Sequence, residues 1–410
     1  MTRSCDVAII GGGPAGAALG AFVAQAGHDV ALFERSTFPR FHIGESLVPA
    51  VNLTLSRLGV LDALDGLGFP QKRGVQFFTE KGGSRPFYFS ETKDPRLHQT
   101  WQVLRGDFDA LLLENARDAG VDVSTGVRVT RVECEGDRVG AIVYRPAEAT
   151  NGDEVTVSAR VVVDASGQNG VLARRLGGRR LVGGLENAAI YAHYRNAKFD
   201  HGIDAGSTLI YRITKSSWLW FIPLPGRASI GLVASAREIA DAEGSPTDIL
   251  RAAIARSDEL SQRLVDAERI GDVRVERDFS YRAQRAGGPG WLLVGDALGF
   301  MDPIYSTGLF LSLHSAELGA AAVNEALSAA SHGNGTAPDF AGFAKDYELA
   351  FDRFLSLVRA FYDPDFHFGA LARDAAHRLG LVDLLIGNVG SPEAIAVSAE
   401  IAALQRPRRE

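Results

Sequence analysis

The sequence has 410 residues, of which 46% are hydrophobic and 23% charged, and its formal net charge is −7. These values are ordinary for a globular protein, and the negative charge argues against a general nucleic-acid-binding protein. The two cysteines, Cys5 and Cys134, lie far apart, and the nine histidines form no HxxxH or HExxH pair. We therefore predict neither a disulfide framework nor a metal site.

The N-terminal apolar run is short, contains Asp6 and continues into a glycine-rich motif, so we predict no signal peptide. No apolar run reaches the roughly 18 residues needed to span a bilayer. Two widely separated cysteines fit a reducing compartment. We therefore predict a cytoplasmic protein that binds neither a membrane nor nucleic acid.

Residues 5–34 have the pattern of a dinucleotide-binding unit. CDVAII is typical of a buried strand, GGGPAG of a tight turn, residues 17–26 of a helix, and DVALFE of a second strand ending at Glu34. The glycines let the backbone approach a pyrophosphate, the helix N-terminus favours its charge, and the acid can bind a ribose hydroxyl. This context favours dinucleotide binding over a purely structural glycine turn.

Two later strands end in polar turns, VVVDASG at 161–167 and WLLVGDA at 291–297. Taken alone, Asp164 and Asp296 would more often be strand-end turn residues. Together with the first motif, they make roughly the first 330 residues similar to FAD monooxygenases of the para-hydroxybenzoate hydroxylase type. The resemblance implies that the first motif binds the ADP half of FAD and that Asp296 hydrogen-bonds the ribityl chain. No second GxGxxG unit follows, so we predict no separate NAD(P)H domain.

Three further motifs narrow the class: FHIGESLVP at 41–49, W-x-W-x-I-P at 218–223, and F-x-x-P-x-x-S-x-G at 300–308. Each motif alone can be structural, and two tryptophans spaced two apart on a strand commonly fill a core. In this order they resemble the flavin-dependent halogenases. Tryptophan halogenases carry a glutamate just before the motif serine, whereas this chain has Tyr305. The resemblance therefore favours the phenol and pyrrole type.

The halogenase resemblance also implies a catalytic lysine. GFPQKRGVQFF contains the pattern K-x-G-x-x-F at Lys72, Gly74 and Phe77. An average lysine is a solvated surface residue. We nevertheless assign the catalytic role to Lys72 and expect the nearby Arg73 and Lys81 to lie at the surface.

The chemistry that the resemblance implies begins with reduced FAD and O2, which form a C4a-hydroperoxide. Chloride or bromide attacks it to give hypohalous acid, which travels to the lysine and then halogenates an electron-rich phenol or pyrrole in secondary metabolism. A separate NAD(P)H-dependent flavin reductase supplies the reduced flavin. The substrate is either free or tethered to an acyl or peptidyl carrier protein.

The resemblance assigns roles to three sets of residues. The halide is held by Ser306, Thr307 and Gly308, and Trp218 and Trp220 shield the flavin from the substrate. FAD is bound by Gly11, Gly13, Pro14, Ala15, Gly16, Glu34, Arg35, Glu45, Ser46, Arg105, Asp164, Gly295, Asp296, Pro303 and Gly308. Three alternatives stay open: an FAD hydroxylase whose helix end serves only the flavin, a geranylgeranyl-reductase-like enzyme, and a flavin-binding protein without catalysis.

The expected fold class is α/β (α+β). A Rossmann-like FAD-binding domain of the glutathione-reductase type is discontinuous over 1–75, 100–175 and 275–330. An antiparallel substrate sheet occupies 76–99 and 176–274, and 331–410 form a helical C-terminal region. There, Phe351, Phe354, Leu355, Val358 and Phe361 share one helix face. We expect this face to pack into the core rather than line a pocket.

Overall fold

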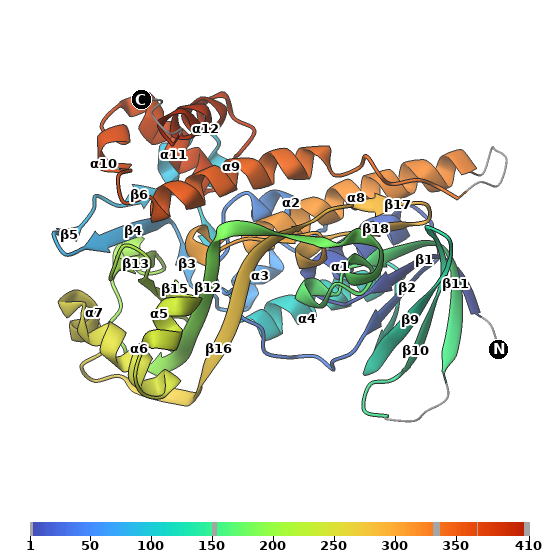
Figure 1. The fold of residues 1–410 in the computed structure, drawn as a ribbon, viewed down its shortest axis with the longest axis horizontal. Helices are drawn as coiled ribbons and strands as arrows, with labels where there is room; N and C mark the ends of the chain where they lie inside the picture. The colour runs from blue at the N-terminus through green and yellow to red at the C-terminus, as the bar shows by residue number, and fades with distance from the viewer. Residues whose placement is uncertain (1–2, 150–153, 331–336, 367, 406–410) are drawn as a thin grey trace.

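The computed structural model describes residues 3–149, 154–330, 337–366 and 368–405. Two β-sheets lie side by side, and the C-terminal helices, drawn in red, gather over one of them (Figure 1). Every helix in the described ranges is too short or too polar to cross a membrane.

The first sheet carries the predicted nucleotide-binding unit. Its path runs β17-β18-β11-β1-β2-β8, and the pairs within β18-β11-β1-β2-β8 are parallel. The hairpin of β9 and β10 pairs antiparallel to β11. Its strands are β1 (Arg3–Ile10), β2 (Val30–Glu34), β8 (Asp122–Thr125), β9 (Val127–Glu135), β10 (Arg138–Pro146), β11 (Val155–Asp164), β17 (Gly287–Gly288) and β18 (Trp291–Leu293).

The central strands of this sheet are buried on both faces, which is why they read as continuous apolar runs. Val7, Ala8 and Ile9 of β1 have no exposed surface. Helices α1 (Pro14–Gln25) and α4 (Arg105–Asp118) contact strands of this sheet, and α8 (Gly308–Ala330) packs against α1 and α2 (Val51–Arg57). The short helix α3 (Ala63–Gly66) follows α2. Because α1 packs against both α4 and α8, the glycine turn before α1 is fixed between the sheet and α8.

The second sheet has nine strands in the path β19-β16-β12-β15-β14-β13-β4-β5, with β6 paired to β4. Its pairs are antiparallel except β4 with β13, which is parallel; no hairpin joins these two strands, so the connection does not fix their relative direction. The strands are β4 (Gly74–Thr79), β5 (Gly82–Gly83), β6 (Phe87–Tyr88), β12 (Arg179–Arg195), β13 (Thr208–Arg212), β14 (Trp218–Leu224), β15 (Arg227–Ser235), β16 (Glu268–Ala283) and β19 (Gly299–Phe300). A separate pair joins β3 (Gln71–Lys72) to β7 (Thr100–Trp101).

Strand β14 is buried at every residue because both faces of its sheet are covered. Leu219 and Phe221 belong to the apolar cluster under α5 (Ala236–Asp241), α6 (Pro246–Ala255) and α7 (Asp258–Arg263). Trp218 and Trp220 belong to the main core on the opposite face. The two-residue period of a strand therefore puts both tryptophans on one face, as their spacing predicted.

The C-terminal helices are α9 (Lys345–Tyr362), α10 (Phe368–Leu371), α11 (Ala375–Leu385) and α12 (Pro392–Leu404), and α9, α11 and α12 gather above β6 (Figure 1). The five apolar residues predicted to share one face of this first helix are all buried. They belong to the main core, so the expectation of core packing is confirmed.

Candidate active site

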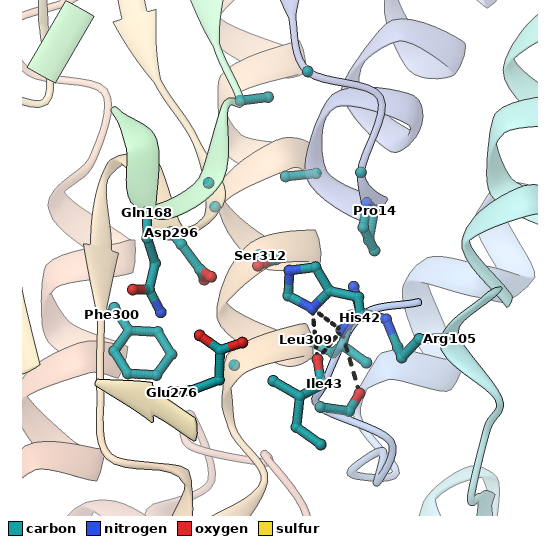
Figure 2. A pocket seen from close by; sticks show the side chains of 18 of the residues that line it. Pro14, His42, Ile43, Arg105, Gln168, Glu276, Asp296, Phe300, Leu309 and Ser312 are labelled. Atoms are coloured by element: carbon teal, nitrogen blue, oxygen red, sulfur yellow. Dashed lines mark hydrogen bonds between the residues drawn. The ribbon is translucent and has the colours of Figure 1, made fainter. Parts of the chain in front are cut away.

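A cavity of about 860 Å³ lies between the two sheets. Its walls include the carboxyl ends of β1, β2 and β11 and the face of β14 that carries the two tryptophans. In α/β sheets, ligands bind beyond the carboxyl ends of parallel strands. Figure 2 shows Pro14, Asp296 and Glu276 around the same space, with Phe300 on one side.

The glycines of the turn have two different roles. Gly13 leaves space for a pyrophosphate, whereas Gly11 and Gly16 allow close contacts between backbone segments. A Cβ added to Gly11, whose φ is +108°, would lie 2.3 Å from the carbonyl oxygen of Ala165, and one added to Gly16 would lie 2.0 Å from the carbonyl oxygen of Gly11. A Cβ on Gly13 would meet only an Arg40 nitrogen, at 3.6 Å. Gly13 is also the N-cap of α1 and has no side-chain cap. The free amides of this helix end therefore face a space that suits an anionic group.

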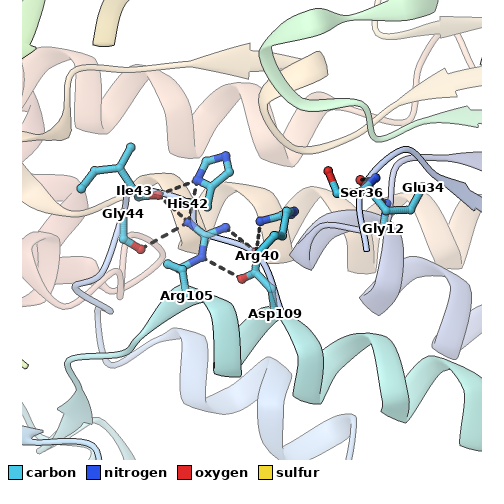
Figure 3. Close-up of polar contacts among 9 residues, drawn as sticks. All are labelled: Gly12, Glu34, Ser36, Arg40, His42, Ile43, Gly44, Arg105 and Asp109. Atoms are coloured by element: carbon cyan, nitrogen blue, oxygen red, sulfur yellow. Dashed lines mark hydrogen bonds and ion pairs between the residues drawn. The ribbon is translucent and has the colours of Figure 1, made fainter. Parts of the chain in front are cut away.

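Glu34 ends β2 at the wall of the cavity. Its Oε2 accepts a 2.7 Å hydrogen bond from the Gly12 amide, and its Oε1 accepts one of 2.8 Å from the Ser36 amide (Figure 3). Both bonds hold the carboxylate at the position where the motif predicts a ribose.

Arg105 anchors the loop that carries the GES motif. Buried Asp109 accepts hydrogen bonds from Nε of Arg105 at 2.7 Å and from Nη1 of Arg40 at 3.0 Å. Nη1 of Arg105 donates to the carbonyl of Ile43 at 2.7 Å (Figure 3). Helix α4 thereby fixes the loop in which Glu45 directly follows Gly44.

Asp296 follows β18 and lines the cavity. Burial raises the pKa of its carboxyl to about 6, against the opposing effect of Arg105 and Arg179. It is therefore mostly ionised at neutral pH and can accept a hydrogen bond from a hydroxyl group. Asp164 differs, because its oxygens accept hydrogen bonds from the amides of Ser166 and Leu172. It stabilises the turn that lines the cavity without lining it, and its contact with FAD stays a prediction.

The turn before α8 has a constrained backbone. Ser306 has a φ of +57°, which is uncommon for a residue with a side chain and marks functional sites often. The amide of Leu311 donates to the Thr307 carbonyl at 2.9 Å, so the helix begins where the motif predicted. Pro303, Ser306 and Gly308 line the cavity, whereas Oγ1 of Thr307 is buried without a partner among the described residues.

A buried hydrogen-bond network joins this turn to the W-x-W motif. Oδ2 of Asp302 accepts hydrogen bonds from Nδ2 of Asn187 at 2.6 Å and from the Tyr362 hydroxyl at 2.9 Å. The Tyr362 hydroxyl in turn accepts a 2.8 Å bond from Nε1 of Trp218. Burial raises the pKa of Asp302. Helix α9 therefore connects both motifs through one phenol.

The two tryptophans form part of the cavity wall. Their ring centroids lie 6.1 Å apart, and only 1% of Trp218 and 5% of Trp220 is exposed. A Cβ at Gly231 on the neighbouring strand would lie 2.2 Å from the Trp220 ring. The absence of that Cβ leaves the room that the indole occupies.

Lys72 is 3% exposed and lies behind the cavity wall. Its Nζ donates to Oγ of Ser46 at 2.8 Å and to the carbonyl of Leu47 at 2.9 Å. Oγ of Ser46 lies 3.0 Å from Oγ1 of Thr208, and both of these residues line the cavity. In the described part of the chain Nζ has no carboxylate partner, and burial lowers the pKa of Lys72 to about 7. Arg73 is exposed, as predicted.

The chain is similar to known proteins along most of its length. The FAD binding domain family matches residues 4–334. A 1H-pyrrole-2-carbonyl-(peptidyl-carrier protein) brominase of Pseudoalteromonas luteoviolacea is 35% identical over 329 residues, which cover 79% of this chain and 78% of that protein. The chain belongs to the flavin-dependent halogenases.

Two further similarities extend to nearly the whole chain. A 1H-pyrrole-2-carbonyl-(peptidyl-carrier protein) chlorinase of Pseudomonas fluorescens is 29% identical over 96% of this halogenase and 91% of that protein. The solved structure of the flavin-dependent brominase Bmp2 is 31% identical and has a TM-score of 0.88 over 98% of each chain. The predicted family, the α/β fold and the use of FAD and halide by this enzyme are thus confirmed.

The structure brings most of the predicted site residues of this halogenase to one cavity. Four do not line it: Gly16, Lys72, Asp164 and Thr307. The ones that do are Gly11, Gly13, Pro14, Ala15, Glu34, Arg35, Glu45, Ser46, Arg105, Trp218, Trp220, Gly295, Asp296, Pro303, Ser306 and Gly308. Within the described ranges, no cluster of His, Cys, Asp or Glu suits a metal ion.

Sequence reasoning missed several polar residues of the halogenase site. Asp302 had a signal, since it immediately precedes Pro303 inside the F-x-x-P motif. Asn187 and Tyr362 had none, because each is a single polar residue in an otherwise ordinary strand or helix. Glu276 of β16 also lines the cavity, although strand alternation alone did not mark it.

Proposed function

We propose that this halogenase uses Lys72 to deliver an electrophilic halogen to an electron-rich pyrrole or phenol. The observation that carries the proposal is a buried amine that has no acidic partner in the described chain and lies directly behind a residue of the cofactor cavity. A surface lysine would show none of these features.

The pKa of Lys72, lowered to about 7 by burial, suits this task. At pH 7 the Lys72 side chain is then neutral in about half of the protein molecules. A neutral amine can react with hypohalous acid to give a haloamine and water. The ammonium form can instead hydrogen-bond the acid. Arginine could not serve, since it does not give up its proton. A fixed donor beside the ring also lowers the barrier by positioning.

We further propose that FAD lies along the cavity, with its pyrophosphate at the start of α1, a ribose at Glu34 and the ribityl chain at Asp296. The free amides after Gly13 and the fixed carboxylate of Glu34 support this arrangement. Bound in reduced form, FAD would activate O2, and O2 would supply the oxidising equivalents that convert halide to hypohalous acid. We assign its reduction to a separate NAD(P)H-dependent flavin reductase, because the chain has one GxGxxG unit.

The halide is assigned to the backbone amides of Thr307 and Gly308. They lie at the first turn of a 23-residue helix, whose N-terminus carries partial positive charge. The left-handed Ser306 turns the chain immediately before these amides. Trp218 and Trp220 line the same cavity, and we propose that they keep the substrate away from the flavin.

The substrate class is proposed from chemistry and from relatives. Tyr305 stands at the position before Ser306 where the resemblance places an acid in tryptophan halogenases, so a ring that needs no such assistance is favoured. Two relatives act on a pyrrole-2-carbonyl group held by a peptidyl carrier protein. We propose the same presentation for this halogenase.

The test supplies reduced FAD, oxygen and either bromide or chloride to the enzyme with a pyrrole-2-carbonyl carrier protein, and reads the acyl group by mass spectrometry. A halogenated pyrrole in the wild type, lost in Lys72→Met but kept in the exposed control Lys81→Met, is the expected result. Halogenation that survives in Lys72→Met would refute the relay. A hydroxylated product formed without halide would refute halogenation itself.

A further inference from the structure

A second cavity of about 390 Å³ adjoins the cofactor cavity. The two share one wall, made by Arg40, Phe41, His42, Glu45 and Arg105. The second cavity, called the outer cavity below, is lined on its other side by the exposed residues Asp107, Asp272 and Arg274. It therefore connects the shared wall with solvent.

Glu45 is the buried carboxylate in this wall. Only 2% of it is exposed, and its Oε1 lies 2.7 Å from Nε2 of His193. Its Oε2 is buried and has no hydrogen-bond partner among the described residues. Leaving a buried acceptor unpaired is unfavourable, so this oxygen is available to bind a proton or another donor.

His193 lies on the outer side of the same wall. It belongs to β12, lines only the outer cavity and has 13% of its side chain exposed. Its ring meets the edge of Phe41 at a centroid distance of 6.0 Å. The pair of Glu45 and His193 thus spans the wall from the outer cavity to the cofactor cavity.

The proposed reaction consumes a proton. One FADH2, one O2, one halide ion and one proton give one FAD, one hypohalous acid and one water. The oxidising equivalents of O2 are divided between the halide and the flavin, and the proton comes from solvent. The cofactor cavity also has exposed lining residues, such as Arg128 and Asn169, and the shared wall offers a second, buried route for this proton.

Resting on that proposed function, we infer that His193 and Glu45 form a relay that carries this proton from the outer cavity to the flavin. The carboxyl group of Glu45 donates its proton from Oε2 into the cofactor cavity. The imidazolium of His193 returns its Nε2 proton to Oε1, and a turn of the ring then brings the bare nitrogen to the outer cavity, where it takes another proton from solvent. A half-turn of the carboxyl group then exchanges its two oxygens and completes the cycle.

Three neighbouring arginines have partners other than Glu45 and His193. Arg40 and Arg105 are both bonded to Asp109, and the guanidinium of Arg274 lies over the Phe41 ring at 3.5 Å. The charged residues that line the two cavities around the pair are Arg40, Arg105, Asp107, Arg227, Asp272, Arg274 and Glu276. His193 is the residue that the structure joins to the Glu45 side chain by a hydrogen bond.

The test compares Glu45→Gln and His193→Gln with the exposed control His201→Gln in the full-length enzyme. FAD affinity is measured by quenching of flavin fluorescence, and halogenation by product mass. We expect both relay variants to halogenate at least tenfold more slowly, with FAD affinity within threefold of wild type and the control unchanged. His193→Ala, which enlarges the outer cavity, should regain activity with added imidazole.

Three results would overturn the relay. Unchanged halogenation in both variants would show that the proton takes another route. A loss of FAD affinity of more than tenfold in Glu45→Gln would make Glu45 the FAD-binding residue that the resemblance implies, in place of a proton carrier. If added imidazole does not restore halogenation by His193→Ala, the side chain of His193 does not carry the proton. If the wild type itself halogenates nothing, the proposed function is wrong, and the relay, which depends on it, is wrong as well.

Discussion

Replacing Lys72 by methionine should change stability in opposite directions at neutral and alkaline pH. Burial moves the pKa of this lysine from 10.5 to about 7. At about 1.36 kcal/mol per pH unit, folding at pH 7 is opposed by on the order of 4 kcal/mol, because the unfolded chain binds a proton that the folded chain half loses. Wild-type stability therefore rises with pH between about 7 and 10.5, and the variant lacks this contribution.

Methionine also removes two hydrogen bonds, those to Ser46 and to the carbonyl of Leu47. Leaving the buried carbonyl unpaired costs about 1–3 kcal/mol at every pH. The net expectation for Lys72→Met is a gain of roughly 1–3 kcal/mol at pH 7 and a loss of similar size near pH 10.5.

Urea unfolding of the protein without FAD, at pH 7 and at pH 10, measures this difference. The exposed Lys81→Met is the matched control and should show no pH-dependent difference from wild type. Other groups titrate equally in all three proteins, so the comparison isolates Lys72. A difference between Lys72→Met and wild type that stays constant across this range would refute the burial argument.

Four other substitutions follow from the geometry. Tyr362→Phe leaves Nε1 of Trp218 without its acceptor and should lower the free energy of unfolding by about 1–3 kcal/mol in urea. Gly13→Ala should fold normally but weaken FAD binding at least tenfold in a fluorescence titration, because the new methyl group enters the space proposed for the pyrophosphate. Gly11→Ala should instead lower the melting temperature, because its methyl group would collide with the carbonyl of Ala165. Trp220→Ala opens the wall of the cavity, so more hydrogen peroxide should be released per flavin oxidised.

Each of these has a result that would count against it. The Tyr362 network is wrong if Tyr362→Phe unfolds at the wild-type urea concentration. If Gly13→Ala binds FAD with wild-type affinity, the pyrophosphate does not lie at the start of α1. Trp220→Ala with unchanged peroxide release and unchanged products would deny the tryptophans their shielding role.

Short-range patterns in the sequence were sufficient for the elements around the cofactor. The strand, turn, helix and strand over 5–34 became β1, α1 and β2, and the two tryptophans lie on one face of β14. Helix α8 begins at the predicted place, and the apolar face of α9 is buried. Each of these depends on periodicity or capping within about 20 residues. The limits of the three predicted regions stay a prediction.

The tertiary structure decided which side chains meet across the chain. Lys72 contacts a residue 26 positions earlier, Asn187 reaches Asp302 over 115 positions, and Glu45 reaches His193 over 148. No local pattern marks such partners, because a single polar residue in a strand or helix has the same neighbours in sequence whether it faces solvent or a buried acid. Strand β12 brings Asn187 and His193 to their partners, and β3 brings Lys72 to Ser46. The sequence determined the elements and the family, and packing determined the burial that lowers the pKa of Lys72.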